Sequence, residues 1–232
     1  MKHFKLKNPF RLLTKFELSL WSVSLIGVLL SFFLSPDRDY LTLASSLVGV
    51  TALIFIAHGL VAGQILCIIF AVLYGTVSII FGYWGEALTY IGMSLPAAVA
   101  ATISWIKNPY ADTDVVRVSK MTKKSTVLMF ILAVPVTLLF YFLLALLKTP
   151  NLFFSALSVT TSFVAAFLSF MRSPFFALAY VSNDIVLIVL WVLAAIEDIS
   201  YLPMVLCFVM FLFNDTYSFI NWKRMEKAQT AQ

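Results

Sequence analysis

Charged residues are scarce in this sequence. Only 12% of its 232 residues are Asp, Glu, Lys or Arg, whereas soluble domains carry roughly 25%. Hydrophobic residues make up 62% of the chain, and the mean hydropathy is +0.98. A chain with so little charge cannot cover a water-exposed surface. The composition therefore excludes a soluble globular domain and indicates an integral membrane protein.

Histidine and cysteine are also rare, and their positions exclude several chemistries. The two histidines, His3 and His58, form no H-E-x-x-H pattern, and the sequence has no G-x-x-x-x-G-K-[ST] motif for ATP hydrolysis. Cys67 and Cys207 lie in apolar runs, where packing is favoured over a disulfide or a metal pair. No Ser, Thr or Cys has a His or Lys partner within the membrane. We therefore expect no metal, no cofactor and no enzymatic activity.

Eight apolar runs of about 20 residues divide the chain. They are apolar all round and lack the alternation of a barrel strand, so we predict an all-α polytopic membrane protein with eight transmembrane helices. The first run resembles a signal peptide, but no small-x-small cleavage site precedes Pro36 and a retained helix is favoured. The predicted spans are 18–34, 41–57, 62–81, 87–106, 126–147, 153–171, 175–196 and 201–222.

The distribution of basic residues predicts the topology. With eight crossings, 14 of the 16 Lys and Arg residues fall on one side, which the positive-inside rule identifies as the cytoplasm. Both termini are expected there, and the net charge of +5 reflects topology rather than a nucleic-acid partner. The basic residues on this side are Lys2, Lys5, Lys7, Arg11, Lys15, Lys107, Arg117, Lys120, Lys123, Lys124, Arg172, Lys223, Arg224 and Lys227. The opposite loops hold Asp37, Arg38, Asp39, Glu86, Lys148, Glu197 and Asp198.

Two halves of the chain resemble each other. Ser46-Leu-Val-Gly-Val-Thr51 is similar to Ala156-Leu-Ser-Val-Thr-Thr161, and each three-helix set ends at a tryptophan, Trp105 or Trp222. Chance similarity between apolar segments is the alternative. A helix between the sets lets both run the same way, which gives a parallel 3+1+3 repeat after one extra amino-terminal helix. The expected parts are the basic tail and extra helix (1–40), the first bundle (41–107), a cytoplasmic loop and linker helix (108–150), the second bundle (151–225) and a tail (226–232).

Polar side chains in the last two spans are the candidate binding residues. One Asp at membrane depth costs about 2.5 to 3.5 kcal/mol, which indicates a solvated cavity. Helical spacing places these residues in one stripe on each helix, with Asp215 flanking the stripe of the last helix, and it places Asp184 and Asp215 at similar depth. Hydrogen bonds between helices are the alternative role. The candidates are Tyr180, Asn183, Asp184 and Trp191 on the seventh helix, Asn214, Asp215, Tyr217 and Asn221 on the eighth, and Tyr74 on the third.

Four other residues have structural interpretations. Trp84, Trp105 and Trp222 lie near predicted membrane interfaces, where indole rings concentrate, so an anchoring role is favoured for each. His58 precedes Gly59 in a short turn and is interpreted as a helix-end residue rather than a ligand or a base.

The last span carries the motif N-D-x-Y-x-F-x-x-W. With this motif and the 3+1+3 order of helices, residues 41–225 resemble the PnuC family of vitamin transporters. The resemblance implies a bacterial inner-membrane carrier with SWEET-like architecture. It also implies that the substrate is nicotinamide riboside, taken up by facilitated diffusion and trapped by a cytoplasmic kinase. Relatives carry thiamine, riboflavin or deoxynucleosides. The residues that match are Asn214, Asp215, Tyr217, Phe219 and Trp222, with Tyr180 and Asp184 at the spacing of the seventh helix.

This sequence departs from the family pattern at one place. Members that carry nicotinamide riboside often have two tryptophans on the seventh helix, where this chain has Phe176 and Tyr180. The identity of the base is therefore left open. The expected partners are a small-molecule substrate and the lipid bilayer, and the oligomeric state is not predicted. The alternative functions are a substrate-binding membrane subunit that needs an energising partner and a scaffold without a substrate.

Overall fold

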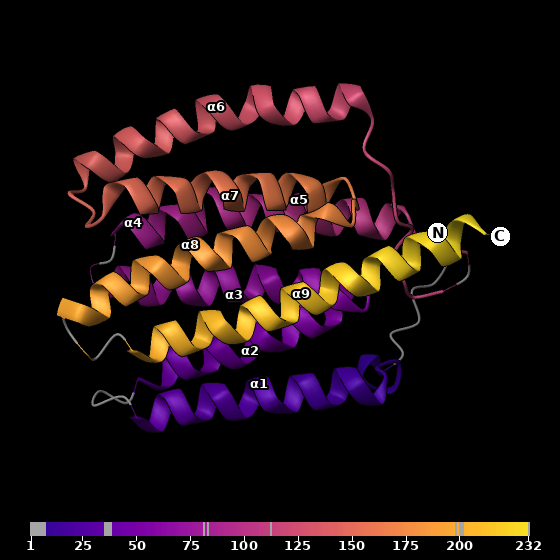
Figure 1. Cartoon of the computed structure of the whole chain (residues 1–232), viewed down its shortest axis with the longest axis horizontal. Coiled ribbons are helices and arrows are strands. Elements are labelled where there is room, and N and C mark those ends of the chain that lie inside the picture. Colours follow the sequence, from indigo (N-terminus) through magenta and orange to yellow (C-terminus); the bar gives the residue numbers. More distant parts are fainter. Residues whose placement is uncertain are drawn as a thin grey trace.

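The computed structural model describes residues 8–34, 39–80, 82, 84–111, 113–197, 199 and 202–231. Among them are eight helical spans long and apolar enough to cross a membrane, which confirms the predicted all-α fold (Figure 1). Predictions that concern Lys2, Lys5, Lys7, Pro36, Asp37, Arg38, Phe81, Asp198 and Tyr201 fall outside the described residues. The spans are α1 (Lys15–Leu34), α2 (Tyr40–Ala57), α3 (Val61–Ile80), α4 with η2 and α5 (Trp84–Ala87, Leu88–Ser94, Leu95–Lys107), α6 (Lys123–Leu146), α7 (Leu152–Phe170), α8 (Phe175–Glu197) and α9 (Leu202–Thr230).

The outer surfaces of these helices are apolar, as contact with lipid requires. On α6, for example, Phe130, Ile131 and Val134 are 60%, 62% and 61% exposed. Hydrophobic side chains gain nothing from leaving lipid, so their exposure carries no penalty in a bilayer. Backbone groups have no water in the hydrocarbon core, and the helices satisfy them internally. The chain thus folds as a polytopic membrane protein.

The helices form two halves with a reciprocal interface. The first half contains α2, α3 and the α4–α5 span, and the second contains α7, α8 and α9. The first helix of each half packs against the last helix of the other, α2 against α9 and α7 against α5. The helices α1 and α6 flank the bundle on opposite sides (Figure 1). Since α1 begins and α9 ends at the same end of the bundle, we call this the terminal end and the other the distal end (Figure 1).

The turns that follow α2 and α7 have the same hydrogen-bond pattern, 113 positions apart. After α2, the N–H of Gly59 donates to Ile56 O and that of Leu60 to Phe55 O, each at 2.9 Å. After α7, the N–H of Arg172 donates to Ser169 O at 2.9 Å and that of Ser173 to Leu168 O at 3.0 Å. Both turns contain a left-handed residue, Gly59 at φ 81° and Arg172 at φ 58°. This match supports the internal repeat with more specificity than apolar sequence similarity does.

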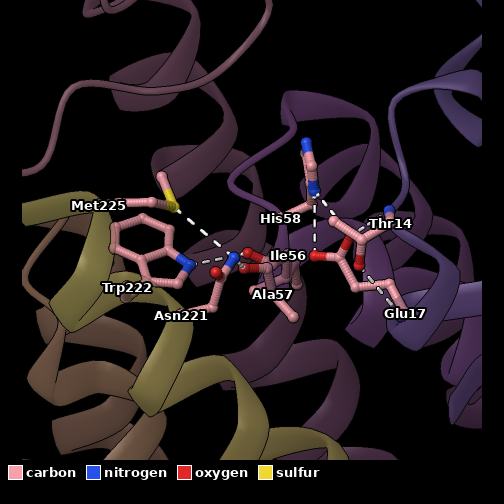
Figure 2. A network of polar contacts seen from close by, with 8 residues as sticks. All are labelled: Thr14, Glu17, Ile56, Ala57, His58, Asn221, Trp222 and Met225. Atoms are coloured by element: carbon pink, nitrogen blue, oxygen red, sulfur yellow. Dashed lines mark hydrogen bonds and ion pairs between the residues drawn. The ribbon is translucent and has the colours of Figure 1, made fainter. Parts of the chain in front are cut away.

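The last helix of each half also donates two hydrogen bonds to the first helix of the other half. Trp105 Nε1 donates to Ser169 O at 2.9 Å, and Ser104 Oγ donates to Phe170 O at 2.7 Å. In the second half, Trp222 Nε1 donates to Ile56 O at 2.8 Å, and Asn221 Nδ2 donates to Ala57 O at 2.9 Å (Figure 2). These pairs occupy corresponding positions in the two halves.

The burial of two tryptophans corrects the expectation that they anchor the protein at the membrane interface. Trp105 and Trp222 are both 0% exposed, whereas Trp84 is 54% exposed. The sequence showed that both residues lie near helix ends, but it did not show that each indole turns inward to reach a backbone carbonyl. A buried indole N–H needs such a partner. The two rings therefore close the interface between the halves at the terminal end.

The long connection between α5 and α6 is fixed to the terminal end rather than projecting from it. The N–H of Val116 donates to Gly59 O and that of Ser119 to Arg172 O, both at 2.9 Å, so the segment bridges both turns. The helix α9 runs eight residues beyond the predicted end of the last span. Its Gln229 makes two hydrogen bonds to the backbone of the segment between α5 and α6. Gln229 accepts from Val118 N at 2.8 Å and donates to Val116 O at 3.1 Å.

The fourth span changes its helical geometry in the middle. Residues Leu88–Ser94 form a π-helix, and Pro96 lies at the start of α5. Proline has no N–H to donate to the preceding turn, and a wider turn accommodates this loss. Because Thr89, Tyr90 and Met93 of this segment line the central cavity, the irregularity lies beside the candidate site.

Candidate substrate cavity

A cavity of about 520 Å³ lies between the two halves. Its size is within the range of about 300 to 1,000 Å³ in which small-molecule sites fall. It extends from Ile56 and Ser169 near the terminal end to Glu86, Lys148 and Glu197 at the distal end. Both halves contribute to its wall, so a movement of one half against the other would change its shape.

Two carboxyl groups line this cavity together. Asp184 of α8 and Asp215 of α9 are each 3% exposed, and the two side chains lie close enough to interact electrostatically. The second oxygen of Asp184, Oδ2, is buried and has no hydrogen-bond partner. The pair thus offers acceptors to a ligand that brings hydroxyl groups or positive charge.

Asn183 lies one residue before this pair and is held in a fixed orientation. Its Oδ1 accepts from Ser158 Oγ at 3.1 Å and from Thr161 Oγ1 at 2.8 Å, both on α7. Because the carbonyl side of the carboxamide is occupied, the Nδ2 donors are the groups that Asn183 can offer to a ligand.

Aromatic rings flank the polar groups on α8. Tyr180 lies one turn before Asp184, and Trp191 lies two turns after it; both line the cavity. The ring of Tyr180 stands edge-on to that of Phe176, with centroids 6.2 Å apart. Flat heteroaromatic ligands stack on such rings. Five of the nine predicted binding residues are therefore brought together around one cavity, namely Tyr180, Asn183, Asp184, Trp191 and Asp215.

The terminal end of the cavity is closed by packed side chains. Phe176 is 0% exposed and packs edge-on against Trp222 with centroids 4.8 Å apart. Beside it, Gln64 Nε2 donates to Ser169 Oγ at 3.0 Å, which joins the two halves by a buried side-chain bond. The cavity therefore has no opening toward the terminal end along these residues, whereas distal loop residues such as Lys148 and Asn151 line it.

The other four predicted binding residues contact protein groups rather than forming the cavity lining. Asn214 Nδ2 donates to Ser24 Oγ of α1 at 2.8 Å and to Met210 O. Tyr217 packs against Phe16 of α1, and Asn221 bonds to α2 at Ala57 O (Figure 2).

Tyr74 on α3 stands behind the cavity wall. Its ring packs against Tyr90 at 4.5 Å and Phe70 at 5.5 Å, and these two residues line the cavity. A binding role for Tyr74, as for Asn214, Tyr217 and Asn221, stays a prediction.

A buried polar network that sequence reasoning did not single out lies near the terminal end (Figure 2). Glu17 of α1 is 0% exposed, and both of its carboxylate oxygens lie 3.0 Å from His58 Nδ1. Thr14 and Glu17 exchange reciprocal bonds, Thr14 N to Glu17 Oε2 at 2.7 Å and Glu17 N to Thr14 Oγ1 at 3.2 Å. This is a capping box, and the T-x-x-E spacing was the available signal. His58 caps the end of α2, as its sequence context indicated.

The described residues contain no group of three or more His, Cys, Asp or Glu that could hold a metal ion. The cavity instead combines a carboxyl pair, a fixed carboxamide and two aromatic rings. This set suits an uncharged or cationic ligand with hydroxyl groups and a flat ring.

Comparisons with known proteins give one consistent result. A family model described as nicotinamide mononucleotide transporter matches residues 39–224. The nicotinamide riboside transporter PnuC of Neisseria mucosa is 24% identical over 224 residues, which cover 94% of this chain and 85% of that protein. A crystal structure of the vitamin B3 transporter PnuC matches with a TM-score of 0.78 and 24% identity, and the match covers 94% of both chains. The structural likeness supports the helical fold.

Proposed function

The chain belongs to the nicotinamide mononucleotide transporter (PnuC) family, and we propose that it carries nicotinamide riboside across the bacterial cytoplasmic membrane by facilitated diffusion. The family is one of transporters, which accords with the absence of catalytic motifs from the sequence. The similar protein of Neisseria mucosa is named for nicotinamide riboside, and this supports the same substrate here.

The observation that carries the proposal is the Asp184–Asp215 pair inside the cavity between the halves. Nicotinamide riboside has vicinal ribose hydroxyls, a carboxamide and a positively charged ring. The carboxyl pair accepts hydrogen bonds from the hydroxyls and attracts the ring charge, and Tyr180 or Trp191 stacks on the ring. Asn183 Nδ2 donates to a remaining oxygen of the ligand. A phosphate group, by contrast, would be repelled by the two carboxyl groups.

The two-fold arrangement of the halves supports an alternating-access mechanism. The side chains of Trp105, Trp222 and Phe176 close the terminal end, and the cavity reaches the distal loops. With both termini in the cytoplasm, the structure would be the state that receives substrate from outside. Rocking of the halves would break the contacts between the two tryptophans and open the cavity to the cytoplasm. A cytoplasmic kinase would then trap the nucleoside and maintain the gradient.

The second candidate function is transport of another nucleoside or vitamin. The aromatic residues of α8 are the observation in its favour. Both Phe176 and Tyr180 line the cavity, but Phe176 is fully buried in the terminal closure. A phenol in place of an indole presents a smaller face to the base. Calorimetric titration with nicotinamide riboside, thiamine, riboflavin, thymidine and deoxyadenosine ranks these ligands directly.

Transport in liposomes tests the mechanism. Purified protein should equilibrate labelled nicotinamide riboside across the membrane without ATP and without an ion gradient, and the rate should saturate with substrate. Empty liposomes and liposomes with the Asp184→Asn variant serve as controls. A requirement for ATP or for an ion gradient would contradict facilitated diffusion and favour an energised system.

A further inference from the structure

Arg172 occupies a backbone position that glycine fills in the other half of the molecule. It follows α7 at φ 58°, and the corresponding residue after α2 is Gly59 at φ 81°. Glycine adopts this left-handed conformation without a steric penalty, and helices commonly end with it. A long cationic side chain at the same position is disfavoured by the backbone. Its presence therefore points to a role for the guanidinium group.

The guanidinium group of Arg172 is incompletely satisfied. Its Nε and Nη1 atoms are buried and have no hydrogen-bond partner, and neither has the buried Oγ of the adjacent Ser173, a residue only 1% exposed. Arg172 as a whole is only partly buried, but buried polar atoms such as its Nε and Nη1 are nearly always paired in folded proteins. Three donors that lack an acceptor within two consecutive residues indicate that an acceptor binds from outside the chain.

The electrostatic surroundings of Arg172 favour an anion. Burial lowers the pKa of Arg172, and the guanidinium of Arg117 lowers it further. No carboxylate forms an ion pair with Arg172 in the described part of the chain. Two cations that approach each other without an intervening negative charge repel one another, and a bound anion would relieve this repulsion.

The start of α8 adds to the same site. This helix of 23 residues begins at Phe175, two positions after Ser173. The N–H of Phe176 already donates to Ser173 O at 3.0 Å, but the N-terminal end of a helix carries partial positive charge. We propose that Arg172, Arg117 and Ser173, at the N-terminal end of α8, form a binding site for a phosphate group. This site is separate from the substrate cavity and does not depend on which nucleoside is carried.

The phosphate group has two possible sources with the same chemistry, an anionic lipid headgroup and a soluble phosphate compound. Basic pockets at helix ends bind lipid headgroups, and the terminal end carries most of the basic residues of this chain. A ligand at Arg172 would also act on the closed end of the cavity, because Arg172 O accepts from Ser119 N and the same turn contains Ser169. The ligand would thus stabilise the turn that Trp105 contacts.

Thermal unfolding of the purified full chain in neutral detergent tests the site. The protein is titrated with sodium phosphate against sodium chloride of equal ionic strength, and separately with short-chain phosphatidylglycerol against phosphatidylcholine. Arg172→Gly removes the guanidinium while suiting the backbone, so this variant is expected to fold. Lys148→Gly is the matched control, because Lys148 is also a left-handed cation, at φ 53°, but lies at the distal end.

We expect saturable stabilisation of the wild-type protein and of Lys148→Gly by phosphatidylglycerol, by phosphate or by both. The apparent affinity should fall about tenfold or more in Arg172→Gly and in Arg117→Ala, because charge-assisted bonds are lost. A response to the lipid alone identifies a headgroup site, and a response to phosphate alone identifies a soluble ligand. An equal response of Arg172→Gly and Lys148→Gly, or no response of the wild-type protein, would overturn the proposal.

Discussion

The indole rings of Trp105 and Trp222 meet at the interface of the two halves, with centroids 5.1 Å apart and an interplanar angle of 49°. Each ring belongs to the last helix of its own half and donates to the first helix of the other, at Ser169 O and Ile56 O. An approximate two-fold axis that relates the halves therefore runs between the rings. The halves are joined by reciprocal bonds at the terminal end, where the proposed alternating access would require a contact that can open.

Replacing either tryptophan by phenylalanine should weaken this closure. Trp222→Phe keeps an aromatic ring but removes the indole donor to Ile56 O, which still accepts from Gly59 N, and Trp105→Phe removes the indole donor to Ser169 O, which still accepts from Arg172 N. We expect each change to lower the free energy of unfolding by about 0.5 to 1.5 kcal/mol, because one buried hydrogen bond is lost. Thermal or denaturant unfolding in detergent measures this change.

Trp84→Phe is the matched control for this experiment, since Trp84 is 54% exposed. It should change the unfolding free energy by less than about 0.5 kcal/mol. If Trp222→Phe and Trp84→Phe have equal effects, the bond to Ile56 O does not stabilise the closed end.

The sequence predicted the helices of this protein well because the signal for them is local. Each span is a run of about 20 apolar residues, and every predicted run contains a helix among the described residues. The end of α9 at Thr230 was not predictable from hydropathy, since its last residues are charged or polar. What holds this extension is the pair of bonds from Gln229 to Val116 and Val118, more than 100 positions away.

The sequence predicted only part of the candidate site, because the rest depends on contacts between residues far apart in the chain. Helical spacing and depth identified Asp184 and Asp215, which do meet. The same reasoning could not separate Asp215 from Asn214, because adjacent residues on a helix point to different neighbours. Asn214 contacts Ser24, 190 positions earlier, on a helix that the sequence treated only as an extra span. Only the packing of the helices shows which face of α9 lines the cavity and which face contacts α1.

The carboxyl pair should determine the response to ligand charge. Asp215→Asn and Asp184→Asn preserve the shape of the side chain and replace an ionisable carboxyl group with a neutral carboxamide. We expect each to reduce the affinity for nicotinamide riboside about tenfold to hundredfold, as loss of a charged hydrogen bond does. The reduced form of nicotinamide riboside has a similar shape without ring charge, and its affinity should fall less. Isothermal titration of both ligands measures the difference.

Asp39→Asn is the control for this prediction, because Asp39 caps α2 outside the cavity lining. It should bind both ligands as the wild-type protein does. Equal losses for the charged and the uncharged ligand would show that the carboxyl pair recognises hydroxyl groups and not the ring charge.

Asn214 should contribute to the docking of α1. Asn214→Ala and Ser24→Ala each remove one partner of a buried bond of 2.8 Å. We expect each to lower the free energy of unfolding by about 1 kcal/mol, and the double variant should lose less than the sum. Calorimetric titration on the same proteins separates the two roles of Asn214. If Asn214→Ala loses affinity for nicotinamide riboside while Ser24→Ala does not, Asn214 contacts the ligand.

Asp39 should make the stability of α2 depend on pH. Burial acts to raise its pKa, but hydrogen bonds from Thr42 and from the N–H of Leu41 outweigh this effect and hold the pKa below the ordinary value of 3.8. A lowered folded-state pKa contributes stability above the unfolded pKa, and this contribution is lost as the pH falls through the folded value. We expect Asp39→Ala to cost about 1 kcal/mol at pH 7, as loss of an N-cap does. The difference from wild type should shrink below pH ~4, and a difference that stays constant to pH ~2 would contradict this assignment.

The Glu17–His58 pair should be the strongest polar link between α1 and α2. Glu17 is fully buried, and it also accepts a hydrogen bond from Thr14 N. A double-mutant cycle with Glu17→Gln and His58→Gln isolates the pair, because Gln keeps the approximate volume of each side chain. We expect a coupling energy of about 1 to 3 kcal/mol in denaturant unfolding, which is typical of buried coupled groups.

The Lys223–Glu226 ion pair on α9 gives the comparison for this cycle, since the side chain of Lys223 is 36% exposed. Exposed pairs contribute about 0 to 1 kcal/mol, so its cycle should show a smaller coupling energy. If the two cycles give the same value, the burial of Glu17 adds nothing to its bond with His58. A larger value for Glu17 and His58 would mean that α1 is fixed to the turn beside Ile56 and Ala57. Because Trp222 and Asn221 donate to those two carbonyls, α1 would then support the closed end of the cavity from the outside (Figure 2).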